Sequence, residues 1–349
     1  MKTLNLFKEA IVPLLAITLI ISCSKNSDDG NGSQQRSIFG SYELVSGTFI
    51  QDNFKYFYIN EDNTLNLLGE DELGFRSELA SNITVSETQL TANIQYYGNL
   101  ILNYTLSEET LELNLAGEPP IILRKIANAP NAQDWIQELT IESEGTLAWE
   151  EDADIAWNGS RILLGNGYEA DNIGVINPNT FTMESEIITT RSAFAVEVEK
   201  NSSVDKLIFQ SDNGSTKFFA YREDTNALVL ESMAMGAWIQ GLASVNSEKI
   251  WASSGNEDQL YLYNYNTNIT EKTIDVDFQP KGLDYQEGFL YVSDGQKLHK
   301  CETAPTLRCI ASYQIPNHQI NGIAYDGSNF WVSARNSSGY KLIKTNLSL

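Results

Sequence analysis

The sequence predicts an all-β protein: a small antiparallel barrel followed by a five-bladed β-propeller that an N-terminal strand closes. Short runs that alternate between apolar and polar residues recur about every 8–11 residues in the first part of the chain. In the second part, a unit of about 40 residues with four short strands recurs. Fourteen Phe, sixteen Tyr and six Trp also favour strands over long helices.

The charge of the chain argues against one class of partner. Its 349 residues include 23 Lys and Arg against 46 Asp and Glu, which gives a net charge of −23. Because nucleic-acid binding needs a basic surface, this balance disfavours DNA and RNA. Two His and three Cys also leave little material for a zinc site or for His-based catalysis.

The first 22 residues have the features of an export signal. Lys2 and Lys8 make its start basic, and the apolar run 11–21 is too short to span a bilayer of about 30 Å as a helix. The sequence Ile-Ile-Ser-Cys that ends at Cys23 resembles a bacterial lipobox. This resemblance implies that residues 1–22 are a lipoprotein signal peptide. It also implies that Cys23 carries the lipid anchor, with palmitate among its acyl chains, at the outer membrane.

The segment after Cys23 is entirely polar. Residues 24–37 contain no apolar side chain, so residues 23–37 are expected to form a flexible tether. The tract around Asp28 and Asp29 resembles the export signal of surface-displayed lipoproteins in Bacteroidota-type bacteria. The resemblance implies display at the cell surface, and retention on the periplasmic face is the alternative. Membrane attachment would then depend on the lipid, because the acidic chain gains nothing from anionic headgroups.

Residues 38–127 are expected to form the barrel. The segment Thr110–Leu115 alternates Leu with polar residues, which is typical of a strand with one buried face. About eight such strands in about 90 residues favour closure, since a closed barrel has no free edges. The opening strand, with Gly40, Tyr42 and Leu44, resembles that of the lipocalin-like domains of bacterial lipoproteins. That resemblance implies a barrel that could hold an apolar ligand, and a filled barrel acting as a spacer or partner-binding module is the alternative.

Residues 128–349 contain the internal repeat, after a linker at 126–133. The segment 154–160 matches 322–328 in residue type, and the cores of the second strands are spaced by 45, 43, 40 and 40 residues. A four-stranded sheet of this length buries its faces only against neighbouring blades, so the repeats predict a ring. The fifth repeat ends after its third strand, and residues 136–149 are expected to supply the fourth. An open β-sandwich is the alternative.

The repeat also carries a family resemblance. The segments 282–293 and 322–333, which share the pattern Gly-[Ile/Leu]-[Ala/Asp]-Tyr followed by a turn and a strand, resemble YncE-like and glutamine-cyclotransferase-like propellers. The resemblance implies a fold that serves both enzymes and pure binding proteins. A propeller enzyme of the glutamine-cyclotransferase or glycan-processing type is therefore the alternative to a binding protein.

Loops at one end of the propeller are expected to carry the ligand site. Carboxylates and amides beside aromatic rings suit glycans or peptides, although Asp and Asn are also common in turns for conformational reasons. The candidate ligand-binding residues are Glu151, Asp152, Tyr168, Arg191, Trp238, Gln240, Lys281, Asp294, His318 and Arg335. His299 falls on a predicted strand and is expected at the surface.

No catalytic constellation is evident in the sequence, so a non-enzymatic binding or interaction module for a glycan, peptide or protein partner is predicted. Glu151, Asp152 and His318 would carry the enzymatic alternative. No cofactor is predicted. The run Glu150, Glu151, Asp152 and Asp154 could offer oxygen ligands to Ca²⁺, but its spacing matches no EF-hand loop, and a solvated acidic patch is favoured. The sequence does not indicate the oligomeric state.

Two cysteines remain after Cys23. Cys301 and Cys309 flank the segment 302–308 between two predicted strands. A disulfide across this hairpin is expected, because secreted proteins pass through an oxidising compartment. Two separate buried thiols are the alternative.

Overall fold

The computed structural model describes residues 37–49, 54–94, 98–147, 149, 153–167, 171–200, 206–212 and 214–349. The signal peptide, Cys23 and most of the tether lie outside these residues. The chain divides into the units Met1–Ser37 and Ile38–Leu349, and the second holds all the secondary structure described below. No helix within the described ranges has the length and apolar character needed to cross a membrane.

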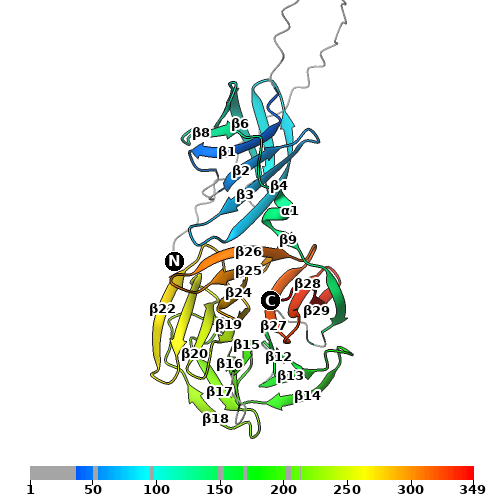
Figure 1. The fold of residues 1–349 in the computed structure, drawn as a ribbon, viewed down its shortest axis with the longest axis vertical. Coiled ribbons are helices and arrows are strands. Elements are labelled where there is room, and N and C mark those ends of the chain that lie inside the picture. The colour runs from blue at the N-terminus through cyan, green and yellow to red at the C-terminus, as the bar shows by residue number, and fades with distance from the viewer. Residues whose placement is uncertain are drawn as a thin grey trace, which may run out of the picture. The chain divides into compact units, whose positions relative to one another are not determined.

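The first domain is a closed barrel of eight antiparallel strands, as predicted (Figure 1). Each strand pairs with the next, and the first pairs with the last. Alternate side chains point inward; they include Tyr42, Phe57 and Leu123, which are buried in one hydrophobic cluster. The strands are β1 (Gly40–Ser46), β2 (Phe54–Ile59), β3 (Thr64–Glu70), β4 (Arg76–Val85), β5 (Gln89–Ile94), β6 (Gly98–Leu106), β7 (Thr110–Asn114) and β8 (Ile121–Lys125).

The second domain is a five-bladed β-propeller, in which each blade is an antiparallel sheet. In Figure 1 the blades follow one another in colour from green to red. The first three blades are β11 (Ile155–Trp157), β12 (Ile162–Gly165), β13 (Asn172–Ile176) and β14 (Met183–Ile188); β15 (Ala195–Val198), β16 (Leu207–Ser211), β17 (Phe218–Arg222) and β18 (Leu228–Glu231); and β19 (Ile239–Ser244), β20 (Lys249–Ser254), β21 (Gln259–Asn264) and β22 (Ile269–Asp275).

The last two blades take strands from upstream of the propeller. The fourth contains β23 (Leu283–Gln286), β24 (Phe289–Ser293), β25 (Lys297–Glu302) and β26 (Arg308–Gln314), and the two-residue strand β9 (Gln137–Glu138) joins it in parallel. The fifth contains β27 (Gln319–Tyr325), β28 (Phe330–Asn336) and β29 (Gly339–Thr345). Strand β10 (Ile141–Thr146) pairs antiparallel with β29 and completes this blade. The predicted closure by residues 136–149 is therefore confirmed.

Two other features bear on the sequence-based expectations. Cys301 and Cys309 face each other on β25 and β26 and form a disulfide, as expected. The linker contains a short helix that was not predicted, α1 (Ala132–Trp135), whose first turn Asn131 caps by accepting a hydrogen bond from the amide of Gln133.

Glycines let the inner strands approach one another closely at the propeller axis. A Cβ atom at Gly322, on β27, would lie 2.7 Å from the Cα atom of Asp154, which precedes β11. A Cβ atom at Gly282 or Gly241 would likewise meet the backbone of the next blade. The starts of the inner strands therefore pack backbone against backbone, and this close packing defines one end of the axis.

Candidate functional site

The five inner strands β11, β15, β19, β23 and β27 give the propeller axis two distinct ends. Their first residues meet at one end, where Gly282 donates a hydrogen bond to the carbonyl of Asn321 at 2.7 Å. We call this the start end. Their last residues lead into the turns to the second strands of the blades at the other end, which we call the turn end.

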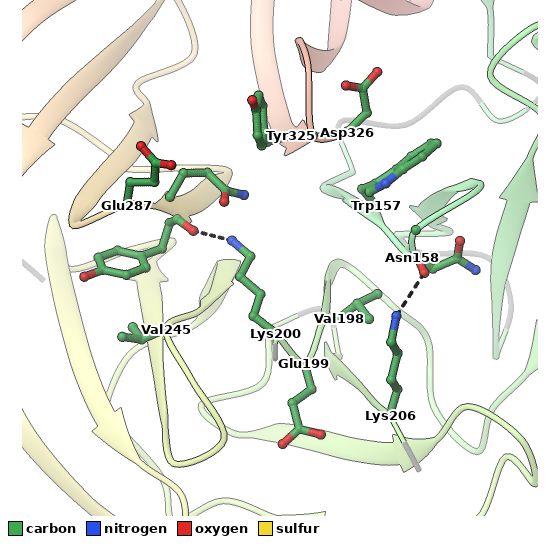
Figure 2. Close-up of a pocket in the computed structure, with 14 residues that line it drawn as sticks. Trp157, Asn158, Val198, Glu199, Lys200, Lys206, Val245, Glu287, Tyr325 and Asp326 are labelled. Carbon is green, nitrogen blue, oxygen red and sulfur yellow. Dashed lines mark hydrogen bonds between the residues drawn. The ribbon is translucent and has the colours of Figure 1, made fainter. Parts of the chain in front are cut away.

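A pocket of about 500 Å³ lies at the turn end, a volume typical of small-ligand sites (Figure 2). Every blade contributes residues from the end of its inner strand or from the turn that follows. Its lining is Trp157, Asn158, Gly159, Val198, Glu199, Lys200, Lys206, Val245, Tyr285, Gln286, Glu287, Tyr325, Asp326 and Gly327. Because all five blades meet here, the closure of the ring creates the pocket.

The turns around the pocket are held by their own side chains. The Oδ1 atom of Asn158 accepts hydrogen bonds from the amides two and three residues later. Asn246 and Asp326 do the same in the third and fifth blades. Asp326 also accepts a hydrogen bond from the indole of Trp331 at 2.8 Å. Both oxygens of Asp326 are therefore used to shape the turn.

The side chain of Lys200 ties two blades together at the pocket. Its Nζ atom lies 2.6 Å from Oδ1 of Asp284, and it also donates a hydrogen bond to the carbonyl of Tyr285 (Figure 2). The Asp284 side chain is only 4% exposed. Although burial lowers the pKa of Lys200, the negative charges of Asp284 and Glu197 raise it above its ordinary value. The ammonium of Lys200 is therefore held beside a carboxylate that largely offsets its charge.

Two more carboxyl groups lie buried along the axis. Glu197 accepts hydrogen bonds from the amides of Val198 and Ser244, and burial raises its pKa to about 7. Asp154 is 2% exposed and accepts a hydrogen bond from the amide of Leu242, while its Oδ1 atom has no partner. Burial raises the pKa of Asp154 well above its usual range. These groups connect the third blade to the first and second.

Three aromatic residues give the pocket its apolar surface: Trp157, Tyr285 and Tyr325, from the first, fourth and fifth blades. The ring of Tyr325 packs on Phe330 with 4.9 Å between centroids. Burial and the charges of Asp326, Glu287 and Asp284 raise the pKa of Tyr325. The phenol of Tyr325 therefore lies among acidic side chains.

The described candidate residues from the sequence gather at the start end. Lys281 donates a hydrogen bond to Oδ1 of Asn321 at 3.0 Å, and His318 lies 2.9 Å from the side-chain amide of Asn336. The backbone of Trp238 is bonded to Asn256, and the Trp238 side chain is 52% exposed. Gln240 has a buried Oε1 atom without a partner.

Of the other candidates, the structure describes Asp294 and the two arginines but not the three remaining residues. The guanidinium groups of Arg191 and Arg335 lie over the rings of Phe219 and Tyr340. Glu151, Asp152 and Tyr168 lie outside the described residues. None of the candidate ligand-binding residues that the structure describes lines the turn-end pocket.

Asp294 and His299 form a pair in the fourth blade. The Nε2 atom of His299 lies 2.9 Å from Oδ2 of Asp294, and its Nδ1 atom lies 2.8 Å from the hydroxyl of Ser312. Although burial raises the pKa of Asp294, the bond and charge of His299 and the charge of Lys297 lower it to about 2. His299 is only 1% exposed, so its expected surface position was wrong. The ring of Phe278 covers His299, with 5.5 Å between the two ring centroids.

Of the four acidic residues in the run 150–154, the structure describes only Asp154. This residue is buried at the axis, which corrects its predicted place in a solvated patch. In the described parts of the chain, no three His, Cys, Asp or Glu side chains come together in a way that would hold a metal ion.

The residues of the pocket carried a signal that the sequence-based argument used only for the fold. Trp157, Tyr285 and Tyr325 occupy the same position of the repeat, the fourth residue of the segments beginning at 154, 282 and 322. An aromatic residue repeated at the end of the inner strand marks a ring of side chains at one end of a propeller.

Comparisons with known proteins bear on the fold alone. No family model and no curated protein matches the chain. The glutaminyl cyclase of Myxococcus xanthus is 11% identical over 60% of this chain and 97% of its own, with a TM-score of 0.49. A PQQ-bound aldose sugar dehydrogenase from Streptomyces coelicolor is 11% identical over 59% of this chain and 97% of its own, with a TM-score of 0.39. The Pan2 WD40 domain of Neurospora crassa is 11% identical over 88% of this chain and 90% of its own, with a TM-score of 0.35. At these values the likenesses carry no argument about function.

Proposed function

We propose that the protein is a non-enzymatic, lipid-anchored binding protein of the outer membrane, whose propeller takes a glycan, peptide or protein ligand at the turn end. The turn-end pocket is the observation that carries this proposal. Aromatic rings offer flat apolar faces to sugars and side chains, and carboxylate, amide and ammonium groups beside them fix orientation.

The lipid anchor and the display at the cell surface rest on the sequence. The lipobox-like segment before Cys23 and the polar residues 24–37 support attachment by lipid and a tether that holds the folded domains away from the bilayer. Labelling cells with a palmitate analogue tests the anchor, since a Cys23→Ala variant should lose the label. Protease added to intact cells separates the cell surface from the periplasmic face.

The barrel is proposed to serve as a spacer or partner-binding module. The interior side chains, among them Phe49, Phe57 and Leu102, are buried in one cluster. A filled interior supports this role over that of a lipocalin-like carrier of apolar ligands. The resemblance of the propeller to the YncE-like and glutamine-cyclotransferase-like families is part of the same proposal and supports the fold rather than an activity.

The test is a binding screen on the full-length protein in detergent, against panels of neutral oligosaccharides and of short peptides. We expect at least one ligand to bind, and Trp157→Leu to weaken binding by about tenfold, since stacking on a buried aromatic face contributes on the order of 1 kcal/mol or more. Trp238→Leu, at the start end, is the matched control and should bind normally.

Each outcome has a clear meaning. Loss of binding in the Trp238 variant alone would move the ligand to the start end. A ligand that is turned over would favour the enzymatic alternative, and Glu151, Asp152 and His318 would then be replaced in turn. The melting temperature of each variant shows whether a loss of binding reflects a loss of folding.

A further inference from the structure

The charged side chains of the turn-end pocket fall into two groups. Most are already used by the protein or covered by it: Asp326 holds its own turn, Lys200 is paired with Asp284, and Glu199 is only 9% exposed and lies against the hydroxyl of Tyr265. Such groups contribute little to a ligand, because a new contact would replace an existing one.

Two charges in the lining are left for a ligand. Glu287 lies in the exposed turn between β23 and β24, and its carboxylate makes no ion pair or hydrogen bond with any described residue. Lys206 lies just before β16, and among the described residues its ammonium group makes a single hydrogen bond, to the carbonyl of Asn158 at 3.3 Å. That is near the upper limit of hydrogen-bond length, so the ammonium keeps most of its capacity to donate.

These two charges come from different sides of the ring. Glu287 belongs to the fourth blade and Lys206 to the second, and Figure 2 shows them on opposite sides of the pocket. The pocket therefore offers a negative and a positive charge on opposite sides, and the ring of Trp157 lies on the same side as Lys206 (Figure 2).

We propose that the turn-end pocket binds a short peptide whose amino and carboxyl ends are both free. Its ammonium group lies at Glu287, its carboxylate lies at Lys206, and a side chain packs on Trp157. A cavity of about 500 Å³ has room for more than one amino acid, which favours a di- or tripeptide. This inference rests on the proposed function and names the ligand class of the same pocket. A neutral glycan would leave both charges unpaired, which disfavours it here.

The experiment uses the full-length protein in detergent and an equimolar mixture of tripeptides Gly-X-Gly, where X is each apolar or aromatic residue in turn. Every peptide is supplied with free ends, with an acetylated amino end and with an amidated carboxyl end. Equilibrium dialysis with mass spectrometry measures which peptides the protein retains. Free peptides should bind, and each block should weaken binding by about tenfold, since a charge-assisted hydrogen bond is lost.

Two variants test which charged side chain each end of the peptide contacts. Glu287→Gln should weaken binding of the free peptide by about tenfold. It should leave the affinity for the acetylated peptide unchanged, because that peptide has no ammonium group to contact Glu287. Lys206→Met should likewise weaken binding of the free peptide by about tenfold and leave the affinity for the amidated peptide unchanged. Glu248→Gln is the matched control: Glu248 is exposed in the equivalent turn of the third blade and does not line the pocket.

The inference is overturned if blocked peptides bind as tightly as free ones, or if acetylation still weakens binding to the Glu287→Gln variant. A pocket that retains no tripeptide but binds an oligosaccharide in a Trp157-dependent way would also overturn it, while the proposed function would stand. If neither panel binds, both fail.

Discussion

Lys200 and Asp284, on the second and fourth blades, form an ion pair of 2.6 Å that passes the third blade at the propeller axis. The ion pair thus adds a connection between blades that strand pairing within each sheet does not provide.

Replacement of Lys200 by Met should lower the free energy of unfolding by about 3 kcal/mol, because Asp284 would remain buried without its partner. The measurement is urea denaturation at neutral pH. Lys217→Met removes an exposed ion pair with Glu231 and should have little effect. Adding Asp284→Asn to the Lys200→Met variant should restore part of the loss. Equal stability of the Lys200→Met and Lys217→Met variants would contradict this role.

Glu197 should make the stability of the protein depend on pH. Its pKa is about 7 in the folded chain against 4.5 for an ordinary Glu, chiefly through burial. Between these values the folded state holds a proton that the unfolded state has released, so the free energy of unfolding should fall as the pH rises. The slope is at most about 1.4 kcal/mol per pH unit and ends near the folded pKa.

Denaturation of the wild type and of Glu197→Gln across this pH range isolates the effect as the difference between the two curves. The variant should lack the downward slope. Parallel curves for the two proteins, or a wild-type stability that rises from pH 5 to 7 relative to the variant, would show that Glu197 is not protonated in the fold.

The strand that closes the propeller can be tested at Gly145, in β10. A methyl group added here would meet the Cβ and Cγ atoms of Phe181. Gly145→Ala should therefore lower the free energy of unfolding by about 2 kcal/mol, as overpacking commonly does. Glu144→Ala changes the exposed neighbour on the same strand and is the control. An unaffected Gly145 variant would mean that β10 is not held against the ring as described.

Loss of the disulfide should cost about 2.5 kcal/mol, the chain-entropy value for a loop of about eight residues. The test compares the wild type with a variant carrying both Cys301→Ala and Cys309→Ala by urea denaturation. Mass spectrometry after alkylation without reductant checks the bond itself. Alkylation of both thiols in the untreated protein would contradict it.

The sequence predicted the blades and the closure because both follow from strand patterns. The fifth repeat visibly lacked a strand, and β10 had the right length and position to supply it. Strand β9 and helix α1 were missed, since two and four residues carry no periodicity.

The pocket was harder to predict because it depends on which end of the axis is filled. Gly241, Gly282 and Gly322 bring backbones together at the start end, a consequence of three-dimensional packing that residue type alone did not indicate. The same packing buries Asp154, although its neighbours in sequence are acidic. The burial of His299 likewise follows from the ring of Phe278, which lies over it although the two residues are 21 positions apart in the sequence.

The most direct test of the account is a structure of the full-length protein with the tightest ligand from the binding screen. The account predicts density at the turn end, in contact with the ring of Trp157 and bounded by Glu287 and Lys206. Density at the start end beside Trp238 and Gln240, or inside the barrel, would contradict it.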